Sequence, residues 1–190
     1  MDGVSTRQNS EWEIFADLPG DPMMWVLILS ELAVFGILLG AFVIASVFNT
    51  PTFAAGHRLL NPALAGFNTV VLMTGGWAAA RGTLAARFNR VKACRLWLWL
   101  AIALGIAFVV AKLVEYAGEI AAGAVFDDNI FFTLYFLLTG FHLLHVVLGT
   151  IILIVVQRAA RPTAVETGTS FWHMVDLVWV LMFPIIYLTR

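Results

Sequence analysis

Residues 23–48 read MMWVLILSELAVFGILLGAFVIASVF, an apolar run interrupted by one ionisable side chain, Glu31. About 20 apolar residues in a helix span the hydrocarbon layer of a membrane, so this run predicts a transmembrane helix. A carboxylate at membrane depth costs roughly 2.5 to 3.5 kcal/mol on insertion scales and is tolerated where protein, water or a partner charge shelters it. The function of the chain therefore depends largely on what Glu31 contacts.

The composition of the whole chain is that of a membrane protein. Of the 190 residues, 61% are hydrophobic and 12% are charged, a balance that a soluble domain of this size could not solvate. The formal net charge is −1 and the cations form no broad patch, which argues against nucleic acid as a partner. The single cysteine, Cys94, excludes an internal disulfide and any cysteine-rich metal site.

Four further apolar runs have the length of membrane-spanning helices, and together they predict an all-α bundle of five transmembrane helices. Residues 1–21 form a polar, acidic tail without the cationic region of a secretory signal, and residues 22–190 form the transmembrane domain. No segment between spans is long enough for a soluble domain, so any chemistry is expected within the helices. The expected spans are residues 22–48, 62–82, 94–116, 130–157 and 172–188.

Lysine and arginine residues set the expected orientation. Most of them lie in the tail, between spans two and three, or before span five, whereas Arg58 and Arg190 lie on the other side. The positive-inside rule then places the amino terminus in the cytoplasm and the carboxyl terminus outside. The cations on the expected cytoplasmic side are Arg7, Arg81, Arg87, Arg90, Lys92, Arg95, Arg158 and Arg161.

Span four carries two histidines three residues apart, His142 and His145, which share one face of the helix. They could belong to a metal or haem site, or they could form hydrogen-bonded packing against a neighbouring helix beside Gly140 and Gly149. A pair of stacked b-type haems needs histidines far apart along a helix, whereas three residues rise only about 4.5 Å. Packing is therefore favoured, and a single haem or metal ion would need ligands from other helices.

Span five carries a second polar pair, His173 and Asp176, spaced to hydrogen-bond locally or to reach a partner's cation. Asp176 and Glu31 could both line a cavity open to the cytoplasm, which is the basis of a proton-relay hypothesis. A structural or lipid-contacting role for the two carboxylates is the favoured interpretation.

Lys112, Glu115 and Glu119 end span three, where they are expected to form an anchor at the outer interface with Lys112 snorkelling to water. Aromatic residues near expected span ends are typical of interfacial belts; they are Trp25, Trp97, Trp99, Phe171 and Trp172. Small residues on span two predict close approach of another helix; they are Gly66, Thr74, Gly75, Gly76, Ala78, Ala79 and Ala80.

Five short patterns, in order on matching spans, resemble subunit III of the haem-copper oxidases. Family members of full length have seven spans, and this chain resembles the five-span form that lacks the first two. Lys112 departs from the family by replacing a usual Gln, and Leu143 departs by replacing a frequent glycine. The patterns are Ser30-Glu31-x-x-x-Phe35-Gly36, Asn68-Thr69, Glu115-Tyr116, Gly140-x-His142-x-x-His145-Val146-x-x-Gly149 and Trp172-His173-x-x-Asp176-x-Val178-Trp179.

The opening Leu18-Pro19-Gly20-Asp21-Pro22-Met23-Met24-Trp25 is most similar to the NorE branch of this family, which is associated with bacterial cytochrome c-dependent nitric oxide reductase. That resemblance implies an accessory subunit of denitrification in the bacterial inner membrane. Such a subunit is non-catalytic, has no haem, copper or other redox cofactor, and supports the assembly, stability or activity of the haem-bearing subunit. The resemblance also implies bound phospholipid, and the expected lipid or internal polar contacts are Glu31, His142, His145, His173 and Asp176.

Three alternatives stay open. The same fold could serve a haem-copper quinol or cytochrome c oxidase as its subunit III. The chain could instead be a small proton-linked transporter that uses Glu31 and Asp176, or a subunit of a b-type cytochrome.

Overall fold

The computed structural model describes residues 22–123 and 129–188, and the expected tail of residues 1–21 lies outside them. Within the described residues the chain is helical and has no strand. Five of the helices are long and apolar enough to cross a membrane, which confirms the predicted all-α membrane bundle. The elements are α2 (Pro22–Phe48), α3 (Thr50–His57), α4 (Pro62–Arg87), α5 (Val91–Ala121), α6 (Ile130–Ala159), α7 (Pro162–Phe183) and the π-helical turn η1 (Pro184–Leu188).

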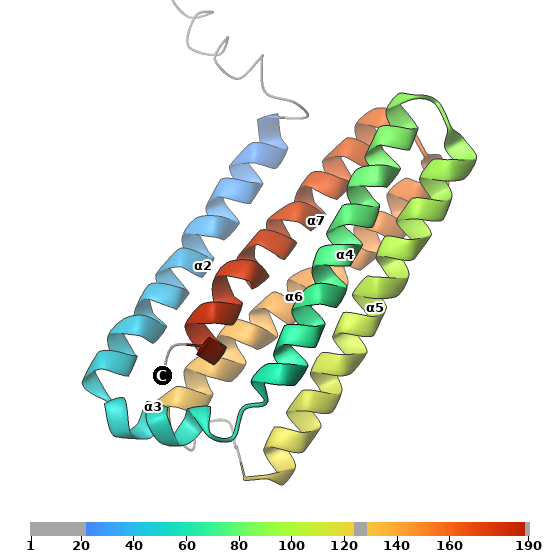
Figure 1. The fold of residues 1–190 in the computed structure, drawn as a ribbon. Coiled ribbons are helices and arrows are strands. Elements are labelled where there is room, and N and C mark those ends of the chain that lie inside the picture. The colour runs from blue at the N-terminus through green and yellow to red at the C-terminus, as the bar shows by residue number, and fades with distance from the viewer. Residues whose placement is uncertain (1–21, 124–128, 189–190) are drawn as a thin grey trace, which may run out of the picture.

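The long helices lie side by side, as Figure 1 shows. Helices α4, α5, α6 and α7 form a ring in which each contacts the next, and α2 packs on α6 and α7 at the edge of that ring. The short helix α3, which the sequence did not predict, follows α2 directly and contacts α6. The connections are short, with residues 88–90 joining α4 to α5 and residues 160–161 joining α6 to α7.

Helix α7 begins at Pro162, ten residues before the expected span 172–188. Proline is favoured in the first turn of a helix, where its missing N–H needs no intrahelical partner. The hydroxyls of Thr169 and Ser170 donate to carbonyls one turn earlier, so these polar residues are accommodated in the extended helix. Residues 162–171 are thus a helical continuation of span five.

Trp172 lies at the centre of the ring and is fully buried, so its expected place in an interfacial belt is wrong; Phe171 is buried too. Glycines on other helices make room for the indole. A Cβ atom on Gly105 would lie 2.5 Å from Trp172 Cη2, and one on Gly149 would lie 3.0 Å from Trp172 Cε3. The error arose because the start of α7 was placed too late, which moved Trp172 to a helix end.

Small residues on α4 allow α5 and α7 to approach closely, as the sequence predicted. Gly75, Gly76, Ala78 and Ala79 are all buried. A Cβ atom on Gly76 would collide with Asp176 Oδ2 of α7. The close approach is therefore made within the chain.

We expect Gly105→Ala to lower the free energy of unfolding of the purified chain by about 1–3 kcal/mol, because the added methyl group meets Trp172 in a packed core. Gly118→Ala is the matched control on the same helix, since no atom lies within 4 Å of its added methyl group. It should leave stability unchanged or raise it by up to about 1 kcal/mol through helix propensity. Titration of detergent-solubilised protein with denaturing detergent measures both, and equal stability of the two variants would contradict this packing.

Candidate functional site

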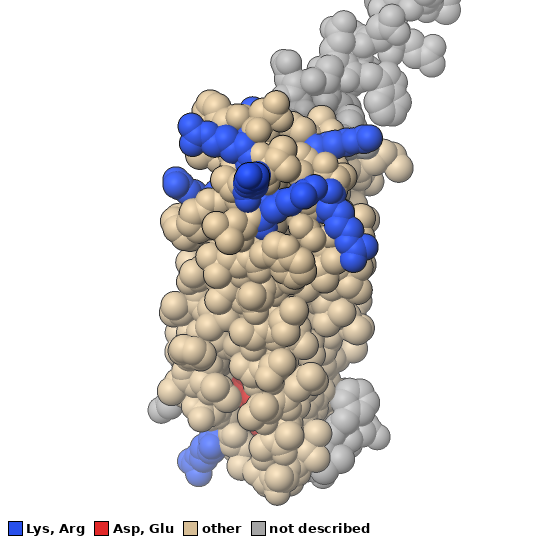
Figure 2. Space-filling view, turned by 90° about the vertical axis from the view of Figure 1, so that its right-hand side faces the viewer, with Lys and Arg blue, Asp and Glu red and all other residues tan. Residues whose placement is uncertain are grey.

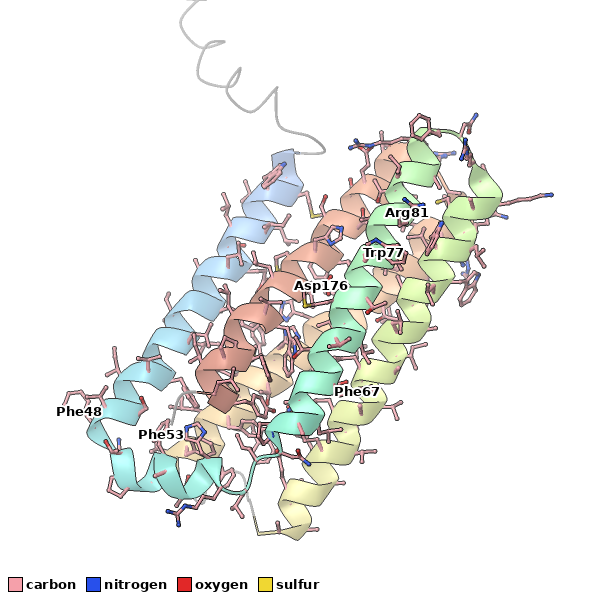
Figure 3. The ribbon with its side chains drawn as sticks, in the orientation of Figure 1. Phe48, Phe53, Phe67, Trp77, Arg81 and Asp176 are labelled. Carbon is pink, nitrogen blue, oxygen red and sulfur yellow. The ribbon has the colours of Figure 1, made fainter. Side chains whose placement is uncertain are left out.

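Cations gather at one end of the bundle, around the turns between α4 and α5 and between α6 and α7 (Figure 2). Arg87 Nε lies 2.6 Å from Glu166 Oε1 and joins α4 to α7 there. The guanidinium of Arg81 lies over the Trp77 and Trp97 rings, at 5.9 and 5.6 Å from their centroids, and Figure 3 shows Trp77 and Arg81 one turn apart on α4. We call this the basic end; which side of the membrane it faces stays a prediction.

Glu31 of α2 contacts His145 of α6, with 3.1 Å between Oε2 and Nε2. Both side chains are largely buried, with 25% and 11% of their surfaces exposed. The Phe35 ring packs edge-on against His145, at 5.3 Å between centroids. The structure therefore brings together two of the polar residues singled out from the sequence. They lie on different helices and are 114 positions apart in the chain.

The hydrogen bond between Glu31 and His145 requires a hydrogen on one of the two groups. His145 Nδ1 lies 2.8 Å from the Phe141 carbonyl oxygen, which can only accept, so Nδ1 carries a hydrogen. The contact from Nε2 to Glu31 then needs a second proton, either on the imidazole, which gives an ion pair, or on the carboxyl group, which donates to Nε2. Both forms shelter the carboxyl group of α2 at a depth where an unpaired carboxylate would be costly.

His142 lies on the same face of α6 but has a different environment. It is fully buried and stacks on Trp179, with ring centroids 5.2 Å apart and planes at 27°. Phe108 and Phe35 pack edge-on against the same ring. Neither ring nitrogen has a hydrogen-bond partner among the described residues, so His142 is held by aromatic packing.

His173 and Asp176 of α7 form the expected local pair, with 3.8 Å between Nδ1 and Oδ2. Asp176 points toward α4, where it packs on the bare backbone of Gly76 (Figure 3). Glu31 and Asp176 thus take different partners, one on α6 and the other on its own helix. A common cavity for the two carboxylates stays a prediction.

The largest polar cluster lies at the end opposite the basic end and centres on Lys112. The ammonium group donates to Glu115 Oε2 at 3.0 Å, to the Tyr135 hydroxyl at 2.9 Å and to the Tyr187 hydroxyl at 2.6 Å. The tyrosines in turn donate to glutamate oxygens, Tyr135 to Glu119 at 2.8 Å and Tyr187 to Glu115 at 2.9 Å. All three protons of the ammonium group are used, which is what a buried lysine requires.

The expected snorkelling of Lys112 to water is therefore wrong. Lys112 is 0% exposed, and Glu115 and Glu119 are 5% and 4% exposed. The two tyrosines that bind Lys112 lie on α6 and η1, 23 and 75 positions after Lys112 in the chain. Sequence reasoning missed Tyr135 and Tyr187. The signal that could have found them is a tyrosine hydroxyl within spans four and five, which needs a polar partner when it is buried.

Among residues 22–123 and 129–188, no three or more His, Cys, Asp or Glu side chains converge as a metal-binding group. The histidines that sequence spacing placed on one face of α6 point to separate partners, Glu31 for His145 and Trp179 for His142. The polar pair Asn68-Thr69 makes interhelical contacts, since Trp179 Nε1 donates to Thr69 Oγ1 at 2.9 Å. The arrangement thus provides proton-sharing pairs and helix-to-helix bonds.

The sequence profile of the cytochrome c oxidase subunit III family matches residues 21–189, nearly the whole chain. The chain belongs to this family. A cytochrome c oxidase subunit 3 from Thermostichus vulcanus is 29% identical over 177 residues, which cover 87% of this chain and 85% of that protein. A cytochrome c oxidase subunit 3 from Corynebacterium diphtheriae is 31% identical over 140 residues, covering 70% of this chain and 68% of that relative.

A quinol oxidase subunit is also similar. The cytochrome bo(3) ubiquinol oxidase subunit 3 from Buchnera aphidicola is 22% identical over 173 residues, covering 87% of this chain and 91% of that protein. Membership of the subunit III family and five apolar helices make this chain a multi-pass membrane protein. The relatives named here are oxidase subunits, which favours the oxidase that the sequence left as an alternative over the nitric oxide reductase.

We expect Lys112→Met to lower the free energy of unfolding by about 3–5 kcal/mol, because it leaves the buried Glu115 without its cation. Lys92→Met, on the exposed start of α5, is the matched control and should change stability by no more than about 0.5 kcal/mol. Denaturing-detergent titration of both variants tests this. If Lys112→Met unfolds at the same midpoint as the control, Lys112 does not hold these helices together.

We expect Glu31 and His145 to be energetically coupled. In a double-mutant cycle of Glu31→Ala and His145→Ala, the interaction energy should be about 0.5–3 kcal/mol, the range found for residues in contact. Glu31→Ala paired with Glu166→Ala serves as the control cycle, since Glu166 pairs with Arg87 instead, and its effects should add. A coupling for Glu31 and His145 that is no larger than in the control cycle would rule out the contact.

Proposed function

We propose that this chain is an accessory membrane subunit that docks on the haem-bearing subunit of a haem-copper oxidase. In this proposal it carries no redox centre and supports the assembly, stability or activity of that partner. The family match over residues 21–189 carries the proposal. Relatives named as subunits of both cytochrome c and ubiquinol oxidases agree with such a role.

The arrangement of the polar side chains supports an accessory role. Glu31 and His145 are occupied with each other, and Lys112 is occupied by one carboxylate and two tyrosines. Side chains used in this way join helices, and they are not free to bind a substrate. His142 packs among aromatic rings on three sides, which leaves little space for a ligand plane beside it.

A nitric oxide reductase is the second candidate partner. It is favoured by the opening Leu18-Pro19-Gly20-Asp21-Pro22-Met23-Met24-Trp25, which resembles the NorE branch. The three-residue connection between α4 and α5 and the two-residue connection between α6 and α7 favour it as well. In both cases the bacterial inner membrane is the proposed location. The concentration of cations at the basic end supports a cytoplasmic position for that end.

Affinity purification from native membranes tests the proposal and separates the two partners. We expect the tagged chain in mild detergent to retain a haem-bearing subunit, which mass spectrometry and the visible spectrum identify. Membranes without the chain should lose oxygen consumption if the partner is an oxidase, or nitric oxide consumption if it is the reductase. Recovery of the chain without any haem protein, together with unchanged rates of both reactions in its absence, would contradict the docking proposal.

A further inference from the structure

The Lys112 cluster carries more acid than base. Its ionisable members are one ammonium group and two carboxyl groups, those of Glu115 and Glu119, and all three side chains are buried. An uncompensated charge inside a bundle costs several kcal/mol, so such a group takes up a proton instead. The other polar or titratable residues that face the cluster carry no compensating charge; they are Tyr116 on α5, Tyr135, Thr139 and His142 on α6, Trp179 on α7 and Tyr187 on η1.

Hydrogen bonding distinguishes the two carboxyl groups. Both oxygens of Glu115 are paired, Oε2 with the ammonium group of Lys112 and Oε1 with the hydroxyl of Tyr187. Glu119 Oε1 accepts from Tyr135, but Glu119 Oε2 is buried and has no hydrogen-bond partner among the described residues. An ionised Glu119 would therefore leave a charged oxygen unpaired, whereas both oxygens of Glu115 have partners.

The position of Glu119 in its helix acts in the same direction. Glu119 lies in the last turn of α5, which ends at Ala121. Unpaired carbonyl groups give the carboxyl end of a helix a partial negative charge, which disfavours a carboxylate there. Glu115 lies one turn further inside the helix and directly beside Lys112.

We infer that Glu119 binds a proton in the folded protein, so that the cluster consists of an ionised Lys112–Glu115 pair and a neutral Glu119. A cavity of about 520 Å³ adjoins the cluster, and Tyr187 belongs to both. The cavity lies at the end of the bundle opposite the basic end. It is lined by Ala54, His57, Arg58, Leu60, Pro62 and Tyr187.

This site is independent of the partner discussed above, because every group in it belongs to this chain.

Infrared difference spectroscopy of the full-length chain in lipid nanodiscs tests the inference directly. Protonated carboxyl groups absorb apart from ionised ones, so subtracting the Glu119→Gln spectrum from the wild-type spectrum at neutral pH should reveal one carboxylic acid band. Glu166→Gln, which removes the carboxyl group that pairs with Arg87 near the basic end, should leave the acid band in place. A difference spectrum without an acid band would overturn the inference.

Thermal unfolding of the same samples gives a second, independent readout. Glu119→Gln replaces a neutral acid by a neutral amide of the same shape, so the unfolding midpoint should not fall. Glu115→Gln removes the carboxylate that pairs with Lys112 and should lower the midpoint clearly. If the two variants lose the same amount of stability, the proton does not reside on Glu119.

Discussion

A polar side chain inside a membrane helix has to find its partner on a neighbouring helix, because the hydrocarbon layer offers no water. This constraint determines how the helices of this chain are joined. Glu31 bonds α2 to α6, Thr69 bonds α4 to Trp179 of α7, and Lys112 bonds α5 to both α6 and η1. Each contact fixes the rotation of a helix about its own axis. Apolar side chains alone specify this rotation poorly, because they contact lipid tails and apolar helix faces about equally well.

Glycine contacts and polar contacts act together in the ring of α4 to α7. Trp172 fills the centre because Gly105 and Gly149 leave space for its indole, and Asp176 fits against Gly76 in the same way. The short patterns that resemble subunit III include several of these positions, among them Glu31, His145 and Gly149. In this structure those residues join or pack helices.

The fold was largely predictable, since the length of an apolar run reveals a membrane helix without knowledge of tertiary structure. The close approach to α4 was also predictable from its small residues.

The hydrogen-bond partners of the buried polar side chains were not predictable. The sequence pattern of one helix shows which of its residues share a face, but not which helix lies opposite that face. Lys112 was misplaced for this reason, because its tyrosines lie 23 and 75 positions away and the rule for lysines near span ends points to water. The start of α7 was set too late because its first turns are rich in Thr and Ser, which have little hydropathy.

We propose that the polar side chains of the helices serve one another as partners and that none of them ligates a prosthetic group. Quantitative iron and copper analysis, with a visible absorption spectrum of the purified single chain, tests this most directly. The account predicts no stoichiometric metal and no haem absorption in the isolated chain. Haem, iron or copper bound in a fixed ratio to the chain, and lost on replacing His142 or His145, would contradict it.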